Sequence, residues 1–218
     1  MLRRIALGVL ATRYCVSGLS DACGRVHFIG NSVSRGWAFA LSARRSGHDE
    51  ITDREEQKQK CGSTEGERCE LPNDVAFTWA WSVWSPLVDA AMREPAQVTV
   101  INVGSHYVFS NVSDFMLVTA RETEFLADAA SAMGPGRAWL RTSTRACGDV
   151  YDHPQTWVNT KLRLSNRVLI RAFEARGLPV FDAWTGDESC VMFDDKVHSR
   201  ALVVQQLDEW LERACQAR

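Results

Sequence analysis

The sequence lacks the features that would assign it to several common functional classes. A formal charge of −2 over 218 residues leaves no excess of basic side chains to bind nucleic acid or an anionic membrane surface. No apolar run approaches the ~20 residues that a membrane-spanning helix needs. The cysteines do not have the spacing of a zinc site. We therefore expect no metal, no cofactor, no nucleic-acid partner and no transmembrane span.

The chain has the length and the 45% hydrophobic content of one globular domain. It contains no internal repeat, and we place the domain at residues 25–218, after an N-terminal segment of residues 1–24. In that segment Arg3 and Arg4 precede the apolar run Ile5–Ala11. This pattern fits a weak signal peptide or a truncated anchor, and it equally fits an element that covers a sheet edge.

Seven cysteines are many for a protein that stays in a reducing cytosol. Cys61 and Cys69 flank a loop rich in glycine and glutamate, where a disulfide would restrain the chain. Further pairs are open among Cys15, Cys23, Cys147 and Cys190. The odd count leaves at least one free thiol. Because Asn111 also begins a glycosylation sequon, these features favour the secretory pathway or the extracellular space, with the cytoplasm as the alternative.

Five short segments have the composition of β-strands, and five longer ones have helical periodicity. The strand segments are Val26–Gly30, Val75–Trp81, Val98–Val103, Ala138–Thr142 and Leu178–Asp182. The helical segments are Ser34–Arg45, Leu87–Arg93, Asp114–Met133, Thr156–Arg176 and Ser199–Gln216. Because strands alternate with helices, we expect a three-layer α/β/α fold with a five-stranded parallel sheet. Its strand order would be the flavodoxin-like 2-1-3-4-5.

Residues 46–74 interrupt this alternation. They are rich in charged side chains and contain almost no large apolar ones. We therefore predict a solvated excursion between the first helix and the second strand.

Polar residues gather where the predicted strands end, which is where open parallel sheets form their sites. The first strand ends in Gly-Asn-Ser, residues 30–32, and a helix follows. A hydroxyl at Ser32 would lie beside the free N–H groups of a helix start, which can stabilise an oxyanion. The alternative is that Ser32 only caps the helix, since serine is a preferred cap.

A second polar group follows the fifth strand, in the segment FDDKVHS of residues 193–199. Asp195 and His198 are three residues apart, so one helical turn would place them on the same face. The carboxylate would then orient the imidazole while the other ring nitrogen accepts a proton from Ser32. Asp194 is a competing orienter, and acidic residues also suit the start of the last helix.

The predicted strand order allows these groups to meet. Strand five would lie three strand spacings from strand one, about 14 Å at ~4.8 Å each. The segment from Ala183 to Asp194 has 12 residues. It spans up to ~40 Å when extended at ~3.3 Å per residue. Chain length is therefore no obstacle to a contact between His198 and Ser32.

Taken together, these blocks resemble the SGNH, or GDSL-like, hydrolase superfamily, from about residue 25 to the C-terminus. The first block is FIGNSVSRG, the third is NVGSHY and the last is DDKVH. With Arg35 and the segment WLRTST, the chain is most similar to the PC-esterase branch, which includes plant cell-wall glycan O-acetyltransferases and related acyl esterases. The resemblance implies Ser32 as the nucleophile, His198 as the base and Asp195 as its orienter.

The sequence departs from the family pattern near the groups that would bind the oxyanion. Asn31 stands where aspartate is usual, and its amide can still hydrogen-bond the turn. The third block has Gly104-Ser105-His106 where the superfamily usually has Gly-x-Asn. The oxyanion hole would then consist of the N–H groups of Ser32 and Gly104 with the His106 imidazole, unless His106 is a buried histidine bonded to a neighbouring loop. The second-block glycine has no clear counterpart in this sequence, where Gly62 and Gly66 are the nearest candidates.

The resemblance implies a serine esterase or acyltransferase that acts through an acyl-enzyme on O-acyl groups, acetyl in particular, of a glycan or a small ester. Arg35, Tyr107 and Trp81 would contact this substrate. The alternative is a non-catalytic carbohydrate-binding domain on the same fold, in which Trp79, Trp81 and Trp84 stack on sugars or simply pack in the core. A flavodoxin-like binding module is a third interpretation, but GNSVSRG has too few glycines to cradle a phosphate. Binding alone does not require the three triad residue types, which favours the enzyme.

Overall fold

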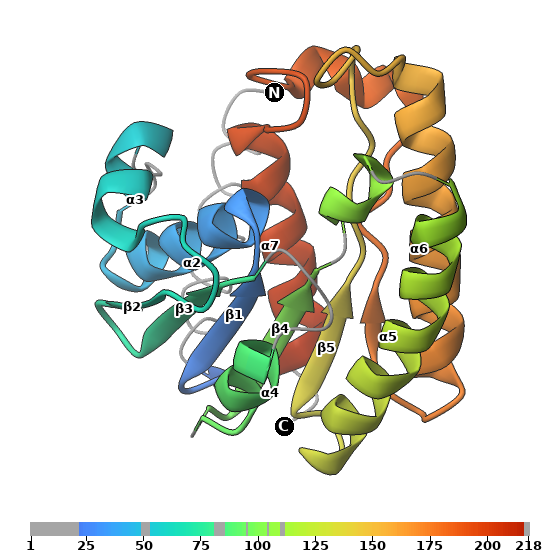
Figure 1. Ribbon diagram of the computed structural model, residues 1–218. Coiled ribbons are helices and arrows are strands. Elements are labelled where there is room, and N and C mark those ends of the chain that lie inside the picture. The colour runs from blue at the N-terminus through green and yellow to red at the C-terminus, as the bar shows by residue number, and fades with distance from the viewer. Residues whose placement is uncertain are drawn as a thin grey trace, which may run out of the picture.

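The computed structural model describes residues 22–48, 53–80, 86–94, 96–103, 105–109 and 112–215. Its strands are β1 (Val26–Gly30), β2 (Arg68–Leu71), β3 (Val75–Trp79), β4 (Val98–Asn102), β5 (Ala138–Arg141) and β6 (Val180–Phe181). Its α-helices are α2 (Ser32–Arg45), α3 (Arg54–Cys61), α4 (Pro86–Met92), α5 (Val112–Ala132), α6 (Gln155–Glu174) and α7 (Arg200–Cys215). Two short 3₁₀ helices are η1 (Ser105–Phe109) and η2 (Asp187–Met192). Helices lie on both faces of the sheet, in three layers (Figure 1).

The sheet has six strands in the order β2-β3-β1-β4-β5-β6, so the predicted count of five and the order 2-1-3-4-5 for the whole sheet are wrong. The additional strand is β2, which pairs antiparallel with β3 at the edge. The five predicted segments are parallel to one another and lie in the order β3-β1-β4-β5-β6. Sequence patterns missed β2 because it reads Arg-Cys-Glu-Leu and is only half-buried, so it has no apolar run.

The insertion of residues 46–74 is also more ordered than a solvated excursion. It contains α3 as well as β2, and α3 packs against α2. The Asp53 carboxylate accepts a hydrogen bond from the Glu55 N–H and so caps the start of α3. A disulfide between Cys61 and Cys69 joins the end of this helix to β2. The insertion therefore forms a small α/β unit attached to the edge of the sheet.

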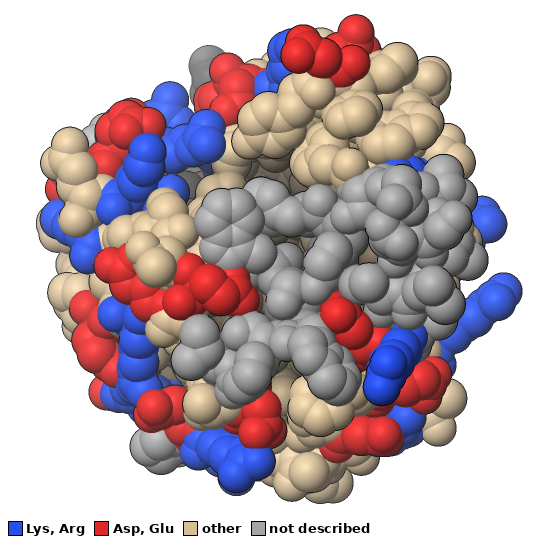
Figure 2. Space-filling view, in the orientation of Figure 1, with Lys and Arg blue, Asp and Glu red and all other residues tan. Residues whose placement is uncertain are grey.

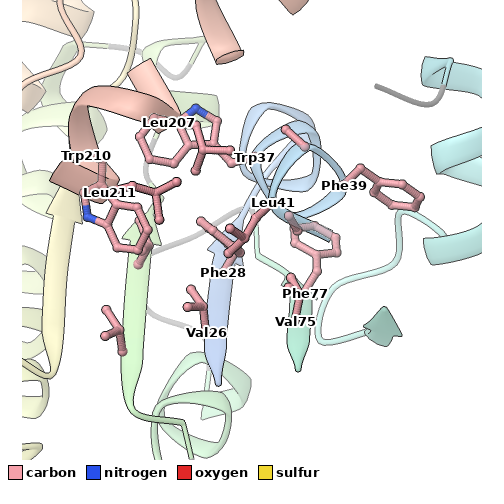
Figure 3. Close-up of a cluster of buried hydrophobic side chains, with 14 of the residues drawn as sticks. Val26, Phe28, Trp37, Phe39, Leu41, Val75, Phe77, Leu207, Trp210 and Leu211 are labelled. Carbon is pink, nitrogen blue, oxygen red and sulfur yellow. The ribbon is translucent and has the colours of Figure 1, made fainter. Parts of the chain in front are cut away.

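Side chains of β1 alternate between two apolar cores. Phe28 packs on the side of α2 and α7, whereas Ile29 faces α4, α5 and α6. Figure 3 shows Trp37 of α2 and Trp210 of α7 meeting over Phe28. The three rings lie edge-on or tilted to one another, with centroids 6.0 to 6.3 Å apart. Each is fully buried, which contributes on the order of 2–3 kcal/mol to folding.

Three disulfides cross-link the described part of the chain, and two of them join segments that are distant in the sequence. Besides the predicted pair in the insertion, Cys23 pairs with Cys215 and Cys147 pairs with Cys190. The Cys23–Cys215 disulfide joins the chain just before β1 to the end of α7. The other joins the loop after β5 to η2. All six cysteines of the described ranges are therefore paired.

Several predictions fall on residues outside the described ranges. They concern most of the N-terminal segment 1–24, including Cys15, and the sequon at Asn111. In the part of the chain that the structure describes, no helix is both long enough and apolar enough to cross a bilayer.

Gly30 ends β1 at a point of very close packing. Its φ of +155° lies in a region of backbone conformation that residues other than glycine rarely adopt. A Cβ atom here would collide with the Asn102 carbonyl oxygen of β4 and with the Ser34 Oγ of α2. Glycine therefore allows the end of β1 to approach β4 while the chain turns into α2.

Gly30→Ala is expected to lower the free energy of unfolding by about 2 kcal/mol or more, because both the collision and the φ angle are unfavourable. Urea unfolding followed by tryptophan fluorescence, with the disulfides intact, measures the change. Gly36→Ala is the matched control. Its Cβ would lie 3.7 Å from Val203 Cγ2, an ordinary contact, and alanine favours the helix by up to about 1 kcal/mol. Equal stability of the two variants would contradict this account of Gly30.

Candidate active site

Ser32 is the first residue of α2, but it does not cap this helix through its side chain. The cap is Asn31, whose Oδ1 accepts a hydrogen bond from the Val33 N–H at 2.9 Å. The Asn31 amide also donates to the Ser105 Oγ at the start of η1. The Ser32 hydroxyl is instead 2.7 Å from the Nε2 atom of His198. Asparagine at the cap therefore leaves the serine hydroxyl available for another contact.

His198 lies between Ser32 and a carboxylate. Its Nδ1 atom is 2.9 and 3.0 Å from the two oxygens of Asp195. The Oδ1 atom of Asp195 also accepts hydrogen bonds from the backbone N–H groups of Val197 and His198, at 2.7 and 2.8 Å. These bonds fix the carboxylate against the ring. A continuous hydrogen-bonded series then runs from Asp195 through the imidazole to the hydroxyl.

Asp194 makes different contacts from its neighbour. Its Oδ2 atom accepts a hydrogen bond from the Arg200 N–H at 2.8 Å, at the start of α7. Its backbone N–H donates to the His198 carbonyl oxygen. Of the two adjacent acids, Asp195 is therefore the one that contacts the imidazole, and Asp194 binds the helix start.

Burial, nearby charges and hydrogen bonds all shift the pKa values of His198 and Asp195. Burial lowers the pKa of His198 below its ordinary value, the Arg54 guanidinium lowers it further, and the Asp195 carboxylate opposes both. For Asp195, burial alone would raise the pKa of the carboxyl group. The N–H groups of Val197 and His198, together with the His198 ring, outweigh this effect and hold the pKa below its usual range. At neutral pH, the pair is therefore a neutral imidazole beside a carboxylate.

A cavity of about 370 Å³ opens beside Ser32 and His198. One wall is charged and comes from α3, with Arg54, Glu55 and Lys58. The other wall is mostly apolar and comes from η1, the loop after β5 and α6. Its apolar residues include Val108, Phe109, Val150, Val158 and Leu162. On the face shown in Figure 2, charged side chains of both signs cover the left-hand part, where α3 lies, and mostly uncharged ones cover the upper right.

Two buried arginines line the cavity between these walls. Arg35 donates to the Gly62 carbonyl oxygen at 2.6 Å and lies over the Trp79 ring, 5.1 Å from its centroid. Arg141, at the end of β5, donates to the Gln206 side chain at 2.9 Å, and burial lowers its pKa to about 9. Arg35 thus binds the insertion, and its predicted contact with substrate stays a prediction. Trp79 is almost fully buried in the core. This agrees with the alternative that its ring packs in the core rather than stacking on a sugar.

The remaining predicted site residues are described in part or not at all. Gly104, Trp81 and Trp84 lie outside the described residues. The backbone of His106 and Tyr107 belongs to η1, but their side chains are not described. The oxyanion hole and the substrate contacts of Tyr107 and Trp81 therefore stay predictions, as does that of Arg35.

Sequence reasoning missed Arg54, which the structure places at this site. Its Nη1 atom donates to the Asp195 Oδ2 at 2.8 Å. A signal for its helix was present, because Asp53 is followed three residues later by Glu56, the pattern of a capping box. The flanking Cys61 and Cys69 were a second sign that this segment is ordered.

Comparison with known proteins gives a likeness at the level of structure. No protein-family model and no curated protein sequence matches the chain. A GDSL-like lipase from Bacteroides thetaiotaomicron aligns with a TM-score of 0.59 at 14% identity, over 89% of this chain and 88% of the lipase. A carbohydrate esterase of family 3 from Talaromyces cellulolyticus aligns at 0.56 and 12%, over 89% and 99%. A carbohydrate acetylesterase from Sinorhizobium meliloti aligns at 0.55 and 10%, over 89% and 100%.

The likeness is one of fold. It extends over most of each chain, and it agrees with the three-layer α/β architecture predicted from the sequence. Identities of 10 to 14% carry no residue-level conclusion. The resemblance to the PC-esterase branch in particular stays a prediction.

The geometry predicts how the His198 ring titrates. Because the Asp195 carboxylate raises the pKa of His198, Asp195→Asn should lower that pKa below its wild-type value. NMR titration of the ring carbons in the two proteins measures the change. Asp194→Asn is the control and should produce a smaller change, since Asp194 contacts Arg200 rather than the ring. A rise in the pKa of His198 in Asp195→Asn would contradict this arrangement.

Proposed function

We propose that this protein is a serine esterase or acyltransferase that acts on O-acyl groups, acetyl in particular, of a glycan. The observation that carries the proposal is the series of contacts from Asp195 through His198 to Ser32, which ends at a cavity. A hydroxyl beside a neutral imidazole, whose other nitrogen faces a carboxylate, is the arrangement that activates a serine for acyl transfer.

In the proposed reaction, Ser32 Oγ attacks the acyl carbonyl carbon while His198 Nε2 accepts the hydroxyl proton. The resulting oxyanion would be held by the N–H groups of Ser32 and Gly104 and by His106. The intermediate then releases the sugar alcohol, which takes the proton from His198, and leaves an acyl-enzyme. Water, or a second sugar hydroxyl, then attacks that ester while His198 accepts its proton, the acyl group leaves as the carboxylic acid or the new sugar ester, and Ser32 Oγ takes the proton back from His198. Asp195 stays ionised and stabilises the imidazolium that forms at each step.

The two walls of the cavity support a substrate ester that has a polar alcohol and an apolar acyl group. The charged wall at α3 suits a polar alcohol such as a sugar, and the apolar wall suits an acyl group. Two proteins of similar fold, described above, are a carbohydrate esterase and a carbohydrate acetylesterase. Three disulfides support a secreted protein, which would meet its glycan outside the cytosol.

Tyr151 presents an exposed aromatic ring at the mouth of the cavity. The residue is 75% exposed, and the centroid of its ring lies 5.2 Å from that of Phe109. The turn that carries it is closed by a bridge between Val150 and His153, and both central residues have positive φ angles, which non-glycine residues rarely adopt. An exposed ring held in this way offers a flat surface to the apolar face of a sugar.

Ser32→Ala is expected to lower kcat for a chromogenic acetyl ester by at least about 10³-fold, because the nucleophile is lost. Since Asn31 caps α2, the variant should unfold at the wild-type temperature. Hydrolysis is measured by absorbance, and the acyl-enzyme is sought as an added acyl mass on the Ser32 peptide.

Asp194→Asn is the control for this experiment and should keep activity near that of the wild type. If wild type binds acetylated oligosaccharides but consumes neither ester nor acyl donor, the proposed activity is wrong. The protein is then a carbohydrate-binding domain with an esterase-like fold.

Tyr151→Ala is expected to raise KM for an acetylated oligosaccharide about 5- to 10-fold, the equivalent of about 1 kcal/mol of stacking. KM for a small aryl acetate should change by less than about twofold, since this ester has no sugar to stack. Tyr151→Phe keeps the ring and should keep the wild-type KM. Val191→Ala, which removes another highly exposed apolar side chain, is the control. Equal effects of Tyr151→Ala on the two substrates would remove this support for a glycan.

A further inference from the structure

The insertion delivers a charged side chain to the carboxylate that faces His198. Arg54 is the first residue of α3, and its guanidinium donates to the Asp195 Oδ2 at 2.8 Å. This oxygen is the one that lies 2.9 Å from the His198 Nδ1. Arg54 also lines both the main cavity and an adjoining one of about 140 Å³, together with Ser32 and His198.

Several contacts hold α3 where Arg54 can make this bond. The Cys61–Cys69 disulfide joins the end of α3 to β2, and Arg35 of α2 donates to the Gly62 carbonyl oxygen directly after the helix. Gln57 and Cys61 are the buried residues of α3 itself. The position of the guanidinium is therefore set by the fold of the insertion, which is itself attached to α2 and β3.

Stability alone is a weak reason for such a pair. The side chains of Arg54 and Asp195 are 51% and 41% exposed, and exposed ion pairs contribute little to folding. The same contact has a larger consequence for the site, because Asp195 is the acid that orients the imidazole. A second bond to Oδ2 restricts rotation of the carboxylate about its own axis.

We propose that Arg54 is a positioning residue for the hydrolysis, one that holds the Asp195 carboxylate in the orientation in which it supports His198. This role rests on the proposed function, since it assumes that His198 acts as the base. The group that does the positioning comes from the insertion rather than from the parallel sheet.

The charges around His198 give the proposal a pH signature. The ring is faced by Asp195 from its own segment, by Arg54 from α3 and by Arg35 from α2. Asp194 and Arg200 lie close by on the same segment as Asp195, and Glu55 and Lys58 lie on α3. After burial, Arg54 is the group that most lowers the pKa of His198. Without the charge of Arg54, the His198 imidazole stays protonated up to a higher pH. A protonated imidazole cannot accept the proton of Ser32.

Arg54→Gln is therefore expected to move the acidic limb of kcat/KM to higher pH, by about half a unit. It should also lower the plateau of kcat about tenfold while KM for a small aryl acetate stays within about twofold, because orientation is lost rather than binding. Arg54→Lys keeps the charge and should keep the midpoint of the limb. It should restore the plateau only in part, since an ammonium does not reproduce the geometry of a guanidinium.

Lys60→Gln is the matched control. It removes one positive charge from the same helix, at an exposed residue that pairs with Glu56 and lies outside both cavities. Its pH profile should match that of the wild type. If Arg54→Gln also matches the wild type in midpoint and plateau, or if Lys60→Gln moves the limb equally, Arg54 has no positioning role.

NMR titration of the His198 ring in wild type and Arg54→Gln separates this proposal from the proposed function. The pKa of His198 should rise in Arg54→Gln whether or not the protein turns over an ester. An unchanged pKa would overturn the role of Arg54 even in an active enzyme. A raised pKa in a protein that hydrolyses no ester would show that the Arg54 contact is as described and that the proposed function is what fails.

Discussion

The carboxylate of Asp195 joins two separate parts of the chain, its own turn, which carries His198, and the insertion, which carries Arg54. It accepts two backbone N–H groups from its own turn, it contacts the ring of His198, and it receives the guanidinium of Arg54. Partial burial of a carboxylate is unfavourable unless donors compensate for the lost water, and here they do. The turn after η2, the imidazole and the insertion are therefore placed relative to one another by a single group.

Much of the fold could be predicted from the sequence because its buried strands have a strong pattern. β1 and β4 are fully buried and mostly apolar, with His27, Thr99 and Asn102 as the polar exceptions, and each is followed by a segment of helical periodicity. The same pattern does not exist in β2, where Arg68 and Glu70 are exposed, or in α3, which has little apolar surface. These elements are stabilised by pairing with β3, by packing on α2 and by a disulfide. Short sequence patterns do not predict such contacts, because they depend on residues outside the element itself.

The candidate site shows a similar division. Ser32, Asp195 and His198 lie within short segments whose residue types suggest a chemistry, and strand order brings those segments together. Arg54 could not be found in this way, since its importance depends on where α3 lies and not on its neighbours in the sequence. Which residue caps α2 could not be predicted either, because Asn31 and Ser32 are both good caps and only the backbone geometry distinguishes them.

The assignment of the helix cap to Asn31 separates the architecture of this protein from its reactive group. A serine that both ended the helix and attacked a substrate would tie folding to activity, so that its loss during evolution would damage the scaffold. Here the hydroxyl contacts only the imidazole among the side chains described. Loss of this hydroxyl alone would therefore leave the helix start and the cavity as they are.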